Sequence, residues 1–313
     1  MVCPAPQGSR KGNRVTAERW ALLLREHDHL VSIAEDWQGE SCDLLIALHA
    51  KKSYRAIKKY RTDRPDAPLV VALTGTDLYR DLPVSRQAQQ SLQWADRLIG
   101  LHECVTRSLP QPLHAKVRVI LQSAQPTAPR LQRSEETFDI CVLGHLRHEK
   151  DPLRTALAVR RLPRLRQLRV IHAGEALSPR FEKWARSAMR KDARYRWLAE
   201  LSRAEVGRLL AASHVMVISS RMEGGANVVS EAIVNGVPIL ASKIPGNEGL
   251  LGEAYPGYFP VADTDALARL LDKTCNDKGL YRELTDRVLA LQPRFQPQHE
   301  REHLQRLVRE FSP

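Results

Sequence analysis

Short and almost uninterrupted apolar segments recur along the chain, and each ends at polar or glycine residues. Such segments are typical of strands buried on both faces, and stretches with helical spacing lie between them. This alternation predicts an α/β fold with parallel sheets covered on both faces. The predicted strands are 42–48, 68–73, a segment ending at Ile99, 117–121, 138–143, 169–173, 215–219 and 239–241. Only 2–5 remain for a first strand, so we expect the natural start to lie upstream.

Capping signals place several helices. Ser202 and Glu205 have the spacing of a capping box and open a helix that reaches Ala212. Asn227 is the expected N-cap of a helix over 228–235, which Gly236 ends. Further helices are predicted over 16–26, 263–273 and 280–291, and another has Pro152 near its start. An apolar stripe runs through the segment that follows Pro297.

A polar, proline-containing segment over 125–137 is the expected linker between two halves. A chain of 313 residues has room for two domains of about 150 residues, each with its own core. We therefore expect an N-terminal domain over 1–124 and a second domain over 125–296.

The amino-acid composition limits the classes of ligand that the protein is expected to bind. The net charge of +12 favours anionic ligands, but aromatic residues make up only 5% and do not interleave with a basic stripe, which argues against nucleic acid. The five cysteines are scattered without metal-ligand spacing, so we expect reduced thiols, no metal site and a cytoplasmic protein. No apolar run approaches the length of a membrane span or a signal peptide.

The segment 215–241 carries the clearest chemistry. Glu223 lies in a glycine turn after a predicted strand, and Glu231 lies about 6 Å along the following helix. A phosphate fits the mouth of that helix, where free amides and the dipole attract an anion. Two carboxylates beside it can bind sugar hydroxyls. The residues that line this predicted donor site are Gly224, Gly225, Ala226, Asn227 and Val228.

The first half offers a second anion site. Parallel strands direct their carboxyl ends to one edge, and polar, glycine and cationic residues follow the strands there. Cations, hydroxyls and glycine amides are suited to a small anionic acceptor. The predicted acceptor residues are Gly12, Asn13, Arg14, His49, Lys51, Thr74, Gly75, Thr76 and Arg80, and Arg10, Lys11 and Lys52 add charge.

The sequence EGGANVVSE resembles the E-x7-E motif of the retaining GT-B glycosyltransferases of family four. The resemblance implies two Rossmann-like domains whose parallel sheets face across a cleft, with the C-terminal helix 297–313 packed back on the first. It implies a UDP-sugar as co-substrate, no tightly bound cofactor and no metal. It also implies that Arg147 and Lys150 bind the diphosphate, although this chain has His145 where the family usually has arginine. Gly174, Trp197 and Leu198 are implied near the base.

A narrower resemblance rests on GSRKGNRVTAERW, ALHAKKS, LTGTDLYRDL and IPGNEGLLGEAYPGYFP, which look like the selenosugar synthase of bacterial selenoneine biosynthesis. It implies transfer of N-acetylglucosamine or glucose from a UDP-sugar to selenophosphate, which forms a 1-selenosugar with a C–Se bond. Selenium is a strong nucleophile, so a general base is dispensable, and Asp77 is the first candidate for one.

Two alternatives stay open. One is an O-glycosyltransferase that acts on an envelope glycan or a small metabolite. The other is a non-catalytic protein that binds anions or nucleic acid. The preferred UDP-sugar, the anomeric outcome and the oligomeric state are left open by the sequence.

Overall fold

The computed structural model describes residues 1–9, 12–127 and 132–311. Contacts divide the chain into two units. The first comprises Met1–Ser123, Glu223–Asn227 and Gln296–Pro313, and the second comprises Ala124–Met222 and Val228–Phe295. Each unit contains one wholly parallel sheet, so the predicted α/β class with two parallel sheets is confirmed.

The first unit is built on four strands in the order β1-β2-β3-β4. The strands are β1 (Leu45–Leu48), β2 (Leu69–Leu73), β3 (Arg97–Gly100) and β4 (Val117–Val119). The helices are α1 (Gly12–Arg25), α2 (Tyr54–Asp63), α3 (Arg86–Trp94) and α11 (Pro297–Arg309), with a π-helical turn η1 (Asp77–Asp81) and the 3-10 turns η2 (Glu103–Ser108) and η3 (Gln111–Lys116).

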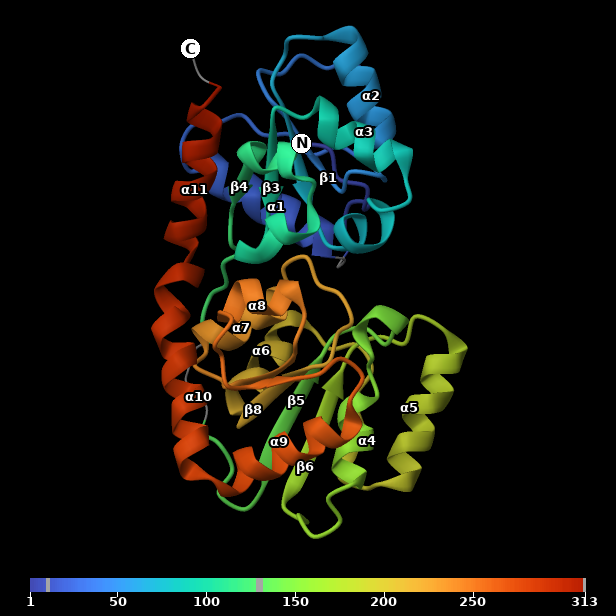
Figure 1. The fold of residues 1–313 in the computed structure, drawn as a ribbon, viewed down its shortest axis with the longest axis vertical. Helices are drawn as coiled ribbons and strands as arrows, with labels where there is room; N and C mark the ends of the chain where they lie inside the picture. The colour runs from blue at the N-terminus through green and yellow to red at the C-terminus, as the bar shows by residue number, and fades with distance from the viewer. Residues whose placement is uncertain (10–11, 128–131, 312–313) are drawn as a thin grey trace. The chain divides into compact units, whose positions relative to one another are not determined.

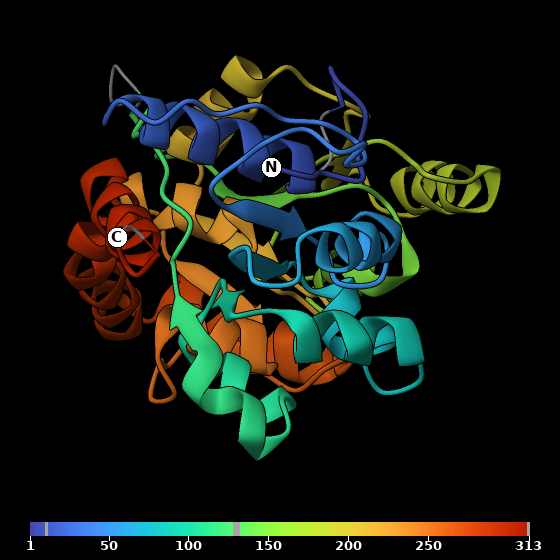
Figure 2. The ribbon, with the colours of Figure 1, turned by 90° about the horizontal axis from the view of Figure 1, so that it is seen from above.

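Alternate residues of the first sheet enter two apolar layers, because successive side chains of a strand point to opposite faces. Ile46, Val70 and Ile99 pack with α1 and α11, whereas the neighbouring residues of the same strands pack with α2 and α3. Figure 2 shows α1 on one side of this sheet and α2 and α3 on the other. In Figure 1 α11 (red) runs beside α1, as their contacts require.

A buried carboxylate fastens α11 to this unit. Glu300 is fully buried and accepts hydrogen bonds from Trp20 Nε1 (2.7 Å), Arg19 Nε (2.9 Å) and the Ser123 amide (2.8 Å). The sequence pattern predicts the apolar stripe of this helix, through Leu304 and Leu307, but not this polar anchor.

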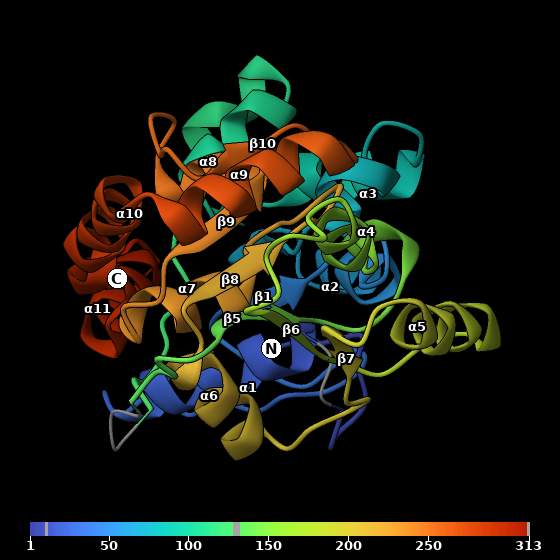
Figure 3. The ribbon, with the colours of Figure 1, turned by 90° about the horizontal axis from the view of Figure 1, so that it is seen from below.

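The second unit is built on six parallel strands in the order β10-β9-β8-β5-β6-β7 (Figure 3). The strands are β5 (Phe138–Leu143), β6 (Leu168–Ala173), β7 (Tyr195–Trp197), β8 (Val215–Ile218), β9 (Ile239–Ser242) and β10 (Tyr258–Phe259). The helices are α4 (Arg154–Arg160), α5 (Pro179–Lys191), α6 (Arg203–Ala212), α7 (Asn227–Val234), α8 (Pro245–Leu251), α9 (Thr264–Asn276) and α10 (Lys278–Leu291), with 3-10 turns η4 (His148–Lys150) and η5 (Gln292–Phe295). Helix α5 lies at the β7 edge.

Several predicted boundaries need correction. Helix α1 begins at Gly12 rather than Thr16, because Thr16 Oγ1 bonds to the Gly12 carbonyl and the helix accommodates the whole turn. Helix α7 begins at Asn227, which is therefore its first residue and not a cap before it. Helix α4 starts only at Arg154, after a 3-10 turn and a left-handed Asp151. The strand predicted over 42–48 is limited to β1, and that over 117–121 to β4.

The capping box is confirmed, since Ser202 Oγ accepts from the Glu205 amide and Glu205 bonds back to the Ser202 amide. Part of the predicted linker, 128–131, lies outside the described residues, as do Arg10 and Lys11. No helix in the described ranges has the length and apolar content needed to cross a bilayer.

Candidate functional site

Two glycine turns lie together at the carboxyl ends of β5 and β6. A Cβ atom added to Gly174 would lie 2.0 Å from the Gly144 carbonyl oxygen, and Gly174 has a φ of +154°. No side chain fits there, because backbone atoms on the facing turn cannot move aside cheaply. The turn after β5, where Lys150 is predicted to bind a diphosphate, is thereby packed directly on the turn after β6.

A histidine of β6 bonds to the backbone of the turn that follows β5. His172 is buried and contacts the Gly144 carbonyl through Nε2 (3.2 Å) and the Tyr195 hydroxyl through Nδ1 (2.9 Å). The carbonyl can only accept, so Nε2 carries a hydrogen. Burial lowers the pKa of His172 to about 4. The sequence signal for this support was a histidine near the end of an otherwise mostly apolar strand, which is too common to indicate such a role.

This histidine makes stability depend on pH in a definite direction. Between the unfolded pKa of about 6.5 and the folded pKa of about 4, the unfolded chain binds a proton that native His172 does not. The contribution of neutral His172 to the free energy of unfolding is therefore complete above about pH 6.5. It falls as the pH drops toward 4, by up to ~1.4 kcal/mol per pH unit.

We expect His172→Gln to lose less stability than the wild type between pH 7 and pH 5, because glutamine can donate to Gly144 without titrating. Urea unfolding at the two pH values measures the difference. Burial also lowers the pKa of His102 to about 4, and His102 is present in both proteins. The free energy of unfolding of the variant should therefore still fall with pH, but less steeply. Equal losses in the two proteins would refute this role for His172.

The predicted diphosphate cations lie on the segment that follows the β5 turn. Lys150 ends the 3-10 turn η4 and lines a hollow at the carboxyl ends of β5 and β8. Its other walls are formed by Val142, Leu143, Gly144, Pro152, His172, Val217, Ile218, Ser219 and Ser220. Arg147 precedes η4, and its buried Nε atom has no hydrogen-bond partner among the residues that the structure describes. The structure thus brings Lys150 to the β5 turn and places Arg147 three residues before it.

Ser219 ties this segment to β8. Its hydroxyl lies 2.9 Å from the Asp151 carbonyl and 3.2 Å from the Lys150 carbonyl, and the Arg221 amide bonds to the Glu149 carbonyl (2.8 Å). A serine at a strand end gives no distinctive sequence signal, which is why Ser219 was not predicted. Its role is to fix the backbone that carries Lys150.

The residues predicted near a base also come together. Trp197 donates through Nε1 to the Gly174 carbonyl (2.8 Å), and the Gly174 amide bonds to the Ala199 carbonyl (2.7 Å). The Leu198 side chain is 37% exposed. His145, in place of the expected arginine, accepts from the Glu175 amide through Nδ1 (3.2 Å), and burial lowers its pKa.

The two glutamates of the motif differ in environment. Glu223 is buried in the loop between β8 and α7, together with Gly224 and Ala226. Glu231 lies in the middle of α7 and is half-buried. Asn227 and Val228 form the first turn of α7, and Gly225 has a φ of +152°. Their roles toward a donor stay predictions.

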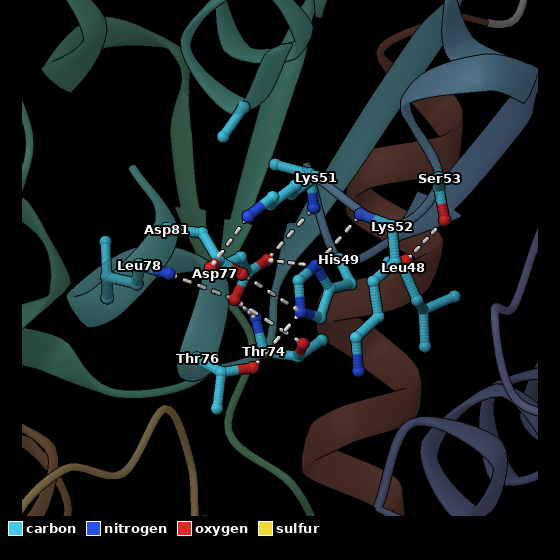
Figure 4. A network of polar contacts seen from close by, with 12 residues as sticks. Leu48, His49, Lys51, Lys52, Ser53, Thr74, Thr76, Asp77, Leu78 and Asp81 are labelled. Atoms are coloured by element: carbon cyan, nitrogen blue, oxygen red, sulfur yellow. Dashed lines mark hydrogen bonds and ion pairs between the residues drawn. The ribbon is translucent and has the colours of Figure 1, made fainter. Parts of the chain in front are cut away.

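In the first unit, predicted acceptor residues gather at the carboxyl ends of β1 and β2. The parallel register pairs Leu48 with Ala72, so His49 follows β1 next to the place where Thr74 follows β2. His49 is buried, has a φ of +73° and contacts Thr76 Oγ1 through Nε2 (3.1 Å) (Figure 4). Gly75 has a φ of +113°, which turns the chain between the two threonines.

Asp77, the first candidate for a general base, lies in a network of backbone hydrogen bonds. Its carboxylate is fully buried and accepts the amides of Ala50 (3.0 Å), Thr74 (2.9 Å) and Leu78 (3.1 Å) (Figure 4). These bonds join the loop after β1 to the loop after β2. A carboxylate held by three amides serves as a backbone anchor, and a role for it as a general base stays a prediction.

Two cations share one carboxylate beside this anchor. Asp81 is buried, and it lies 3.4 Å from Lys51 Nζ and 3.3 Å from Arg80 Nε. Burial alone would raise the pKa of Asp81, but the bonds and charges of Arg80 and Lys51 outweigh it and the pKa is lowered. Both cationic side chains are more than 40% exposed, so each retains surface that an anion can approach.

The start of α1 supplies the remaining predicted acceptor residues. Gly12 is exposed and Asn13 is half-buried, whereas Arg14 is buried and pairs through Nε with Glu18 (2.7 Å). Arg14 is therefore already paired within its helix. In the described ranges, no cluster of three or more histidine, cysteine, aspartate or glutamate side chains has the geometry of a metal site.

The chain matches the family model described as "Glycosyl transferases group 1" over residues 125–288. Its fold is similar to that of Anabaena Alr3699/HepE in complex with UDP and glucose, with 16% identity, 98% of each chain covered and a TM-score of 0.76. Sucrose-phosphate synthase of Thermosynechococcus elongatus shares 16% identity over 86% of this chain and 73% of its own, with a TM-score of 0.64. A glycosyltransferase of Rickettsia africae shares 13% identity over 98% and 84%, with a TM-score of 0.68.

Proposed function

Since the chain belongs to the family of group 1 glycosyl transferases, we propose that it transfers N-acetylglucosamine or glucose from a UDP-sugar to selenophosphate. The observation that carries the donor half is the placement of Lys150 in the hollow beside the β5 turn. The acceptor half rests on the cationic, hydroxyl-rich loops at the carboxyl edge of the first sheet and on the resemblance of their sequences to selenosugar synthases.

For the donor, we assign the diphosphate to Lys150, Arg147 and the amides of Gly225 to Val228. Fixed cations and amides stabilise charge that grows on the leaving group. Glu231 binds the ribose and Glu223 a sugar hydroxyl in this assignment. The similar HepE structures contain UDP, UDP with glucose, and UDP-glucose, which supports UDP as the carrier.

The proposed step forms a bond from selenium to the anomeric carbon. The bond from that carbon to the diphosphate oxygen breaks, and its electron pair leaves with UDP. Water then cleaves the P–Se bond of the product, which yields inorganic phosphate and the 1-selenosugar. Lys150 and Arg147 supply the positive charge that the leaving group needs, so the proposal includes no metal ion. The scattered spacing of the five cysteines in the sequence fits the proposed cytoplasmic location.

Release of UDP tests the acceptor. The protein is incubated with UDP-N-acetylglucosamine or UDP-glucose, alone, with selenophosphate, and with simple hydroxyl acceptors such as glycerol and glucose. We expect UDP release to depend on selenophosphate. Release that requires a hydroxyl acceptor would favour the O-glycosyltransferase instead, and UDP-sugar binding without release under any condition would favour a binding protein.

A separate prediction concerns the division of labour between the units. We expect Glu231→Ala to weaken UDP binding about tenfold, in the range of a hydrogen bond to a charged group, whereas Arg80→Ala spares UDP binding and raises the KM for the acceptor. Calorimetry with UDP measures the first effect, and Glu283→Ala, an exposed glutamate on α10, is the matched control. Equal loss of UDP affinity in the Glu231 and Arg80 variants would contradict the division.

A further inference from the structure

The two threonines that flank Gly75 have hydroxyl groups with different hydrogen-bond partners. Thr74 Oγ1 lies 3.5 Å from Asp77 Oδ1, and Thr76 Oγ1 lies 3.1 Å from His49 Nε2. Asp77 can only accept, because its carboxylate already takes three backbone amides. The hydroxyl proton of Thr74 is therefore directed inward, toward the anchor of the loop.

The ring of His49 decides the direction of the other bond. Its Nδ1 atom receives the Lys52 amide at 3.3 Å, and an amide can only donate (Figure 4). Nδ1 therefore carries no hydrogen, and the hydrogen of the neutral ring lies on Nε2. That hydrogen is directed at Thr76 Oγ1, because the alternative acceptor, Asp81 Oδ2, is 3.8 Å from Nε2.

Thr76 consequently accepts from His49, and its own hydroxyl proton is left to donate elsewhere. The ring is buried, and burial lowers its pKa below the ordinary value despite the opposing charges of Asp77 and Asp81. The hydrogen bonds thus run in one direction, from the Lys52 amide to His49 and from His49 to Thr76.

We propose that His49 is a positioning residue that makes the Thr76 hydroxyl a fixed hydrogen-bond donor, so that the first unit selects an acceptor with an anionic oxygen. This inference rests on the proposed function and deepens it. The surroundings agree in charge, since Lys51 and Arg80 stand on the same loops, half-exposed and held by buried Asp81. A neutral hydroxyl acceptor also needs its own proton accepted, and this arrangement offers it donors.

Matched valine variants test the threonine assignment. Thr76→Val removes the hydroxyl that His49 positions, and Thr74→Val removes the hydroxyl that is directed at Asp77. Both substitutions keep the size of the side chain. We expect Thr76→Val to raise the KM for selenophosphate about tenfold or more, in the range of a lost hydrogen bond to an anion, with UDP affinity unchanged. Thr76→Ser restores the KM. Thr74→Val, which also removes a predicted acceptor hydroxyl, raises the KM less than Thr76→Val does and lowers the melting temperature.

Two histidine variants separate positioning from a structural role. Glutamine at position 49 places an amide donor near the former Nε2, whereas asparagine suits the left-handed backbone and the Lys52 amide but is too short to reach Thr76. We expect His49→Gln to keep a near-wild-type KM for selenophosphate and His49→Asn to raise it as Thr76→Val does. A better KM with asparagine than with glutamine would overturn the positioning role.

The outcomes separate the two proposals. If the wild-type protein does not turn over selenophosphate, the proposed function fails. If it does, but Thr76→Val and Thr74→Val have the same KM, only the donor assignment fails. The threonine pair decides the inference even when a histidine variant does not fold.

Discussion

We expect Lys150→Ala to lower kcat for sugar transfer by about 10²- to 10³-fold, with a smaller effect on the KM for the UDP-sugar. Lys150 lies in the hollow at the ends of β5 and β8, and Ser219 and the packed glycine turns fix the backbone around it. A pre-positioned cation acts most strongly when the diphosphate gains charge as the glycosidic bond breaks, and losing one such group has a cost of this size.

Steady-state UDP release measures the effect, with Lys183→Ala as the matched control. Lys183 is an exposed lysine of α5, so its replacement removes the same charge from the protein and should leave kcat within about twofold. A Lys150 variant that raises only the KM would show that the lysine binds substrate and transition state equally, and would contradict the assignment to the leaving group.

The second large effect concerns stability. We expect Glu300→Ala to reduce the free energy of unfolding by about 3–5 kcal/mol, because it leaves Arg19 without its buried partner, and the Trp20 indole N–H and the Ser123 amide without their acceptor. Glu300→Gln keeps the shape and should lose less. Urea unfolding followed by tryptophan fluorescence measures both variants.

Glu302→Ala on the same helix is the control, because Glu302 is exposed and bonds only to Gln298 Nε2 among the described residues (2.9 Å). Its replacement should change stability by less than about 0.5 kcal/mol. If Glu300→Ala were as mild, α11 would be held by its apolar stripe through Leu304 and Leu307 alone.

Much of the fold could be predicted from the sequence, because buried parallel strands leave continuous apolar runs. Strand β5 has the predicted bounds at both ends, and β8 and β9 differ by one residue at one end. The edge strand β10, with two residues, carries too little pattern to be found. The start of α1 was missed because Gly12 and Asn13 favour turns locally, while the Thr16 and Arg14 side-chain bonds within the helix favour its extension.

The position of Lys150 after a buried strand was predictable from the sequence, whereas its role toward a diphosphate stays a prediction. Hydrogen bonds from a side chain to a backbone group of another loop were not predictable from the sequence. Asp77 is of a residue type that can act as a general base. The amides that donate to its carboxylate come from two loops, and Ala50 lies 27 residues before it in the sequence. The same holds for His172, His49 and Ser219, because each acts through a backbone group that only the folded chain brings near.

The most direct test of the account is mass spectrometry of the product. The protein is incubated with UDP-N-acetylglucosamine, selenophosphate and an excess of chelator, and the mixture is searched for a sugar with the isotope pattern of selenium. The account predicts such a selenosugar, formed with UDP in equal amount and unaffected by the chelator. Absence of a selenium-containing sugar from reactions that release UDP would contradict the selenophosphate acceptor, and formation only without chelator would contradict the metal-free leaving-group site.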